Sequence, residues 1–108
     1  MLNRLEYLTQ CLQEECAEVA KAASKCQRFG FLDKHRGVVN KDQLSDELID
    51  LRVVIEMLRD ELQLRGVYLT TRYPEKEIKK RDKVENSMLE SKDKNRFYDL
   101  LVDEEDDP

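Results

Sequence analysis

The sequence predicts an all-α protein, in which a helical hairpin and a third helix form a four-helix-bundle-like core on oligomerisation. Apolar residues recur at steps of three and four along two long segments, which is the period of a helix. Apolar and charged residues each make up 40% of the chain, so each helix has one face to bury. At 108 residues the chain fits one domain, expected over residues 1–96, and residues 97–108 are expected to form an apolar patch and a disordered acidic tail.

The first helix is expected from about Leu2 and should end near Phe29, because Gly30 can take the left-handed conformation that follows a helix end. Residues 31–41 contain Gly37 and no sustained period, which predicts a loop, or a loop with a short helical turn. The apolar positions that define the first helix are Leu5, Leu8, Leu12, Val19, Ala23 and Cys26.

The second helix is predicted to be capped by Asp42 or Ser45 and to end at Gly66. Its apolar stripe consists of Leu44, Leu48, Leu51, Ile55, Leu58 and Leu62. A third helix should begin at Pro74, which suits a first helical position, and run to about Lys94. Its apolar residues are few and its charges alternate in sign, so it is expected to be solvated or ordered only against a partner subunit.

The net charge of −5 belongs to the tail, because residues 103–107 are five acids and the rest of the chain is balanced. A neutral body argues against a broad nucleic-acid footprint, which needs a surplus of Lys and Arg on one face. The chain contains no apolar stretch long enough to span a bilayer and no signal-peptide pattern, so we expect no membrane partner and a cytoplasmic location. Three cysteines in the first helix lack metal-ligand spacing and are expected to be buried thiols.

Acidic residues border the apolar stripes of both predicted helices. Glu15 lies three residues after Leu12 and four before Val19, and Glu18 follows one turn later. Glu47 and Asp50 repeat this spacing on the second helix. If the helices pack as an antiparallel hairpin, the four carboxylates converge, which like charges do only around a cation. Oxygen ligands without His or Cys favour Mg²⁺, with Mn²⁺ as a possible substitute.

These motifs resemble the all-alpha nucleoside triphosphate pyrophosphohydrolases of the MazG-like branch, which carry Glu-x-x-Glu on one helix and Glu-x-x-Asp on the next. The first motif reads Glu14-Glu15-Cys16-Ala17-Glu18, with the doubled Glu of MazG-like chains, and the second reads Glu47-Leu48-Ile49-Asp50. The stretch Ala23–Gly30 is also similar to small phage and bacterial members. The resemblance covers residues 5–62 well and the third helix loosely.

The resemblance implies a magnesium-dependent hydrolase that converts a (d)NTP to a (d)NMP and pyrophosphate. It implies that Mg²⁺ is held by Glu15, Glu18, Glu47 and Asp50. Glu14 would orient or deprotonate the attacking water. Lys25 and Arg28 are candidate phosphate ligands, or else only complement the helix C-terminus. Loose similarity of the third helix adds Lys83 and Asn86 as substrate-binding candidates.

A thin core predicts association, so we expect a homodimer or homotetramer. A second interpretation is a non-catalytic helical interaction module that dimerises through its leucine stripes and binds a partner through residues 97–102. A third is a metal-binding sensor or storage bundle. Carboxylate-bridged di-iron proteins use Glu-x-x-His pairs, and the absence of His from these helices counts against that chemistry.

Overall fold

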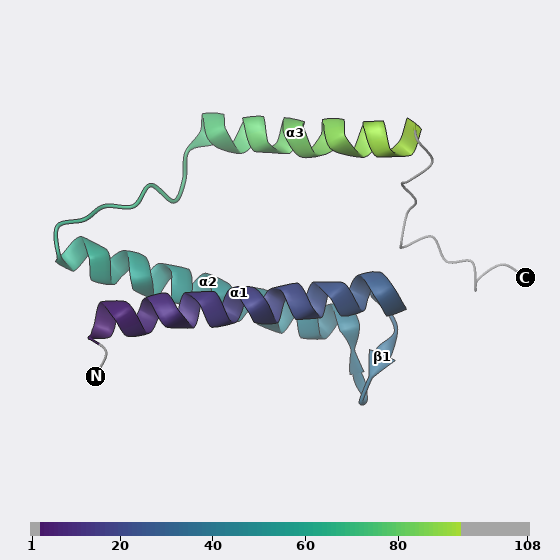
Figure 1. Ribbon diagram of the computed structural model, residues 1–108, viewed down its shortest axis with the longest axis horizontal. Helices are drawn as coiled ribbons and strands as arrows, with labels where there is room; N and C mark the ends of the chain where they lie inside the picture. The colour runs from purple at the N-terminus through teal and green to yellow at the C-terminus, as the bar shows by residue number, and fades with distance from the viewer. Residues whose placement is uncertain (1–2, 94–108) are drawn as a thin grey trace, which may run out of the picture. The chain divides into compact units, whose positions relative to one another are not determined.

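A computed structural model describes residues 3–93, and 78% of the structure is helical. The order of elements is α1 (Arg4–Phe29), β1 (Lys34–His35), β2 (Val38–Val39), α2 (Asn40–Leu64) and α3 (Pro74–Asp93). Figure 1 shows α1 and α2 lying side by side, joined at one end by the two short strands. The prediction of a mostly helical fold is confirmed, with the small sheet as an addition.

Side-chain and backbone caps define both ends of α1. At its start, Asn3 Oδ1 accepts a hydrogen bond from Glu6 N at 2.8 Å, and Asn3 Nδ2 donates to Glu6 Oε1 at 2.7 Å. At its end, Gly30 has φ +103° and its N–H donates to the Cys26 carbonyl at 2.9 Å. The predicted end of this helix is therefore confirmed, and it depends on a glycine that can adopt positive φ.

The connection between α1 and α2 is a β-hairpin, so the prediction of a loop or helical turn over residues 31–41 is wrong. Lys34 pairs with Val39 and His35 with Val38 in an antiparallel ladder. Arg36 and Gly37 form the tight turn, with φ values of +53° and +82°. Positive φ at both turn residues is the geometry that matches the twist of a two-residue hairpin. Strands of two residues are too short to produce an alternating pattern in the sequence.

The start of α2 also differs from prediction. The helix begins at Asn40, so neither Asp42 nor Ser45 is its cap, and the residue at the cap position, Val39, offers no side-chain hydrogen bond. The first N–H groups of α2 donate to backbone carbonyls of the preceding turn and not to a capping side chain. The hairpin brings these carbonyls to the first helical turn.

Asn40 anchors this turn. Its side chain is 2% exposed, and Nδ2 donates to the Gly30 carbonyl at 2.9 Å. Its backbone N–H donates to the Asp33 carbonyl at 2.8 Å, and the next N–H, of Lys41, donates to the Phe31 carbonyl at 2.9 Å. The end of α1 and the start of α2 are thereby tied to one turn.

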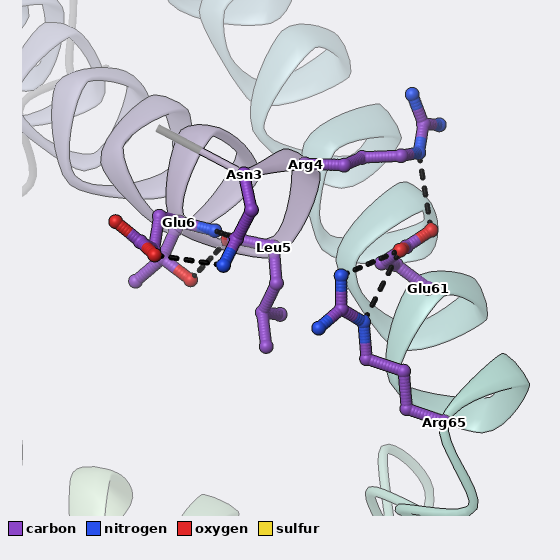
Figure 2. Close-up of polar contacts among 7 residues, drawn as sticks. Asn3, Arg4, Leu5, Glu6, Glu61 and Arg65 are labelled. Carbon is purple, nitrogen blue, oxygen red and sulfur yellow. Dashed lines mark hydrogen bonds and ion pairs between the residues drawn. The ribbon is translucent and has the colours of Figure 1, made fainter. Parts of the chain in front are cut away.

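A seam of inward-facing residues joins α1 to α2. Its buried apolar members are Leu8, Ala22 and Cys26 on α1 and Leu58 on α2. At the far end of the pair, Arg4 Nε lies 3.1 Å from Glu61 Oε2, and Arg65 donates to Glu61 Oε1 from Nε and Nη2, each at 3.3 Å (Figure 2). Because the start of α1 meets the end of α2, the two helices run antiparallel.

All three cysteines are free thiols, but they differ in exposure. Cys26 is buried in the seam, Cys11 is half-buried and Cys16 is exposed. The prediction of buried thiols is confirmed for Cys26 and wrong for Cys16. Burial also raises the pKa of the Cys26 thiol.

The chain divides into two compact units, and the boundary in the sequence falls between Leu69 and Thr70. Unit 1 contains α1, the hairpin and α2, and unit 2 contains α3, which begins at Pro74 as predicted. The predicted apolar patch and acidic tail, residues 97–108, lie outside the described residues. None of the helices described over residues 3–93 is long and apolar enough to cross a membrane.

Candidate metal centre

Three of the predicted carboxylates meet in the middle of unit 1. One oxygen from each of Glu15, Glu47 and Asp50 lies within 4.8 Å of one from each of the other two. Glu15 comes from α1, and the other two come from successive turns of α2. The i,i+3 spacing places Glu47 and Asp50 on neighbouring positions of one helix surface.

Two of these acids occupy seam positions. Glu15 lies seven residues from both Leu8 and Ala22, which are buried in the seam, and is itself half-buried. Glu47 lies seven residues after the buried Asn40 and is also half-buried, whereas Asp50 is exposed at the edge. A repeat of seven returns to nearly the same helix face, so both glutamates stand where a packed pair of helices ordinarily has apolar side chains.

Glu15 is the least satisfied of the three carboxylates. Its Oε2 is buried and has no hydrogen-bond partner. Its pKa is raised, first by desolvation and then by nearby negative charges, in decreasing order those of Asp50, Glu47, Glu18 and Glu14. Both causes oppose the charged form, and a positive ion among these oxygens would relieve both.

The sequence did not single out Gln43 as part of this cluster. Gln43 Nε2 donates to Glu47 Oε1 at 2.9 Å, which fixes one oxygen of Glu47 and leaves the other free. The available signal was the i,i+4 spacing of Gln and Glu on one helix, a common pairing that has many non-functional examples.

Glu18 and Glu14 lie near the cluster but outside it. Glu18 is exposed and is not one of the residues whose oxygens meet within 4.8 Å. Glu14 is exposed as well, and both charges lie near enough to raise the pKa of Glu15.

The candidate phosphate-binding residues fall into two groups. Lys25 is half-buried and Arg28 is exposed, both on α1 of unit 1. The Arg28 guanidinium carbon lies 5.0 Å from the centre of the Phe29 ring, so this side chain stacks on its neighbour. Lys83 and Asn86 are exposed on α3 and belong to unit 2.

The ligand set fits a hard divalent cation, because it consists of carboxylate oxygens, one of them buried without a partner. Comparisons with protein-family models, curated proteins and solved structures gave no match to this chain.

Proposed function

We propose that the protein is a magnesium-dependent nucleoside triphosphate pyrophosphohydrolase, which converts a (d)NTP to a (d)NMP and pyrophosphate in the cytoplasm. The observation that supports this most is the meeting of Glu15, Glu47 and Asp50 from two helices, with Glu15 Oε2 buried and unpartnered. The resemblance of the two acidic motifs to MazG-like enzymes adds the reaction type.

In this proposal Glu15, Glu47 and Asp50 hold Mg²⁺, and Mn²⁺ is a possible substitute. Glu18 joins them by a change of side-chain rotamer, since it follows Glu15 by one turn. The bound ion would neutralise phosphate charge and lower the pKa of a coordinated water. Gln43 keeps Glu47 in the orientation that leaves one oxygen free.

The remaining roles are proposed for Glu14, which adjoins Glu15, and for basic and polar residues further along the chain. Glu14 orients the attacking water or accepts its proton, as an exposed carboxylate next to a metal ligand can do. Lys25 and Arg28 supply positive charge to the phosphates from α1. Lys83 and Asn86 are proposed as substrate-binding residues from the loose sequence resemblance of α3 alone.

The proposal is tested by incubating a panel of NTPs and dNTPs with Mg²⁺ and measuring the release of monophosphate and pyrophosphate. Glu47→Gln should lower turnover by at least about 100-fold, because loss of groups that merely support a metal ligand costs 10- to 100-fold. Asp46→Asn is the matched control, since Asp46 is exposed and adjacent on the same helix. Its turnover should stay near that of the native protein. If no nucleotide in the panel yields pyrophosphate, the enzyme proposal is refuted.

We further propose that chains associate as a homodimer or homotetramer through α2. Six large apolar side chains of this helix are exposed, and two of them belong to the stripe that the sequence predicted to be buried. They are Leu48, Ile49, Val53, Ile55, Met57 and Leu64, which are 48%, 48%, 42%, 39%, 38% and 84% exposed. Exposed apolar residues at helical spacing are typical of a surface that another helix covers. Light scattering should give a multiple of the chain mass, reduced by Ile49→Asp with Val53→Asp. A monomeric mass for the native protein would contradict the proposal.

The same outward face favours the alternative of a non-catalytic helical interaction module. The two functions differ in their dependence on the acidic cluster. A module should tolerate Ala at Glu15, Glu18, Glu47 and Asp50 with association unchanged and no activity to lose. An enzyme should lose turnover while the fold and the association remain.

A further inference from the structure

The charges of unit 1 are segregated along its length. Residues 21–41, which we call the basic end, contain six basic residues and a single acid, Asp33. The rest of unit 1 contains eleven acids and four basic residues. The near-zero charge of the body is therefore an average over two regions of opposite sign. The basic residues are Lys21, Lys25, Arg28, Lys34, Arg36 and Lys41.

Most of these cations have no acidic partner. The ion pairs found within residues 3–93 join Arg4 and Arg65 to Glu61, Arg59 to Asp60, and Lys41 to Asp42. Only Lys41 of the basic end takes part in them. Asp33, the acid of this region, accepts a hydrogen bond from the backbone N–H of Lys34 at 2.8 Å. The positive charge is thus available to an external anion.

The basic end is held by a hydrogen-bonded scaffold. The buried Asn40 and the short ladder between β1 and β2 connect it to both helices. At the tip, Arg36 adopts φ +53°, a left-handed conformation that costs a non-glycine residue roughly 1 kcal/mol. Asparagine is the residue that commonly takes this position in such turns, so nothing in the turn itself explains an arginine there.

Planar and apolar groups accompany the charge. Arg28 stacks on Phe29, whose ring is 53% exposed, and Leu32 is 64% exposed. Positive charge combined with aromatic and guanidinium planes is the combination that binds single-stranded nucleic acid, through backbone phosphates and stacked bases. A membrane surface suits this region less well, because the turn of the hairpin, Arg36 and Gly37, presents a charge and no apolar side chain for insertion.

We propose that the basic end binds single-stranded nucleic acid. Lys21 to Phe29 alone extends over about 12 Å at 1.5 Å per residue, and the hairpin carries Lys34 and Arg36 beyond α1. A strand carries one phosphate per nucleotide along its whole length, so several phosphates meet these cations together, whereas one triphosphate reaches only some of them. The proposal goes beyond nucleotide hydrolysis, because the basic end adds Lys21, Lys34, Arg36 and Lys41, to which the proposed hydrolysis assigns no role.

The test measures fluorescence anisotropy of a labelled oligonucleotide of about 20 nucleotides, with the full-length protein, across a salt series. The native protein should bind at low salt, and the affinity should fall steeply as salt rises. Replacing two cations, Lys34→Gln with Arg36→Asn, should reduce the steepness of the log–log salt dependence by about 1.4, because each contact to a single strand contributes about 0.7. Asn suits a left-handed position, so this variant should keep its thermal stability.

Arg52→Gln with Arg59→Gln is the matched control, because it removes two positive charges from α2 outside the basic end. It should leave the salt dependence unchanged. The proposal is overturned if the native protein fails to bind at low salt, or if both double variants bind equally. It is also overturned if inorganic tripolyphosphate displaces the oligonucleotide at equal phosphate concentration, or if phosphatidylserine vesicles bind and the oligonucleotide does not. None of these outcomes depends on hydrolysis, so this experiment tests nucleic-acid binding independently of the proposed enzyme activity.

Discussion

The position of Glu15 in the seam is unfavourable for its negative charge. The seam would accommodate an apolar side chain there, yet a carboxylate with a buried, unpartnered oxygen occupies the position beside two others. Without a cation, ionised Glu15 opposes the folded state through lost hydration and like-charge repulsion. Unit 1 should accordingly respond to both proton and metal concentration.

This unfavourable position predicts a particular pH dependence. The pKa of Glu15 is raised above its ordinary 4.5 in the folded protein, so the protonated side chain favours folding. That stabilisation is complete below about pH 4.5 and is lost as the pH rises through the elevated value. With EDTA present, the Tm of the native protein should fall toward neutral pH more than that of Glu15→Gln.

Circular dichroism melts between about pH 4 and pH 8 measure this difference. At pH 7 without metal, Glu15→Gln should melt above the native protein, and added Mg²⁺ should raise the Tm of the native protein alone. If the Tm of the two proteins depends on pH in the same way, ionised Glu15 does not destabilise the folded state.

Sequence spacing was sufficient to select Glu15, Glu47 and Asp50, because each position follows from a period of 3.6 residues. It could not separate Glu18 from them. Glu18 lies three residues after Glu15, hence about 60° around the helix, and small differences in rotation and side-chain direction decide whether an oxygen reaches the cluster. Cys16 shows the same limit, since one residue of offset turns it to solvent.

At the level of elements, Asn40 connects the hairpin to both helices. Asn40→Ala should destabilise the protein by about 1–3 kcal/mol, because it removes a buried side chain that donates a hydrogen bond to the Gly30 carbonyl. The free energy of unfolding from urea titration measures the loss. Ser45→Ala is the control and should change it by less than about 0.5 kcal/mol, since Ser45 caps no helix. A larger loss for Ser45→Ala than for Asn40→Ala would contradict this account.

The opposite end of the helix pair depends on Glu61. Its side chain is 12% exposed and contacts Arg4 from α1 and Arg65 one turn later (Figure 2). Arg4 is 61% exposed, so water screens this pair. Glu61→Gln should therefore cost only about 0.5–1 kcal/mol in low-salt urea titrations, and less in high salt. Glu56→Gln, an exposed acid on the same helix, should be neutral; equal effects of the two variants would argue against the ion pairs.

The end of α1 and the start of α3 could be predicted from the sequence. Gly30 can adopt the positive φ that follows the end of α1, and Pro74 has the fixed φ of a first helical position. The start of α2 could not be predicted, since its first donors are satisfied by carbonyls of the hairpin, and the hairpin is itself too short to leave a pattern. These hydrogen bonds to α2 form only after the turn has formed, so the sequence around the start of the helix does not predict them.

At the level of the whole molecule, the division between Leu69 and Thr70 predicts where proteases act first. The residues between α2 and α3 include Arg65 and Arg72, outside both helices. Brief trypsin treatment should cut there before it cuts at Arg52 or Arg59 within α2, because cleavage needs an extended, accessible backbone. Mass spectrometry of early fragments measures this order. First cuts inside α2 would show that the helix pair opens more readily than the connection.

The opposite charges at the two regions of unit 1 give it a dipole moment. A diffusing anion would be turned toward the hairpin before any contact is made, and a cation toward the carboxylates. Association rates for ions of either sign should then exceed those expected from the net charge alone, and the excess should vanish once salt shortens the Debye length below the separation of the two regions.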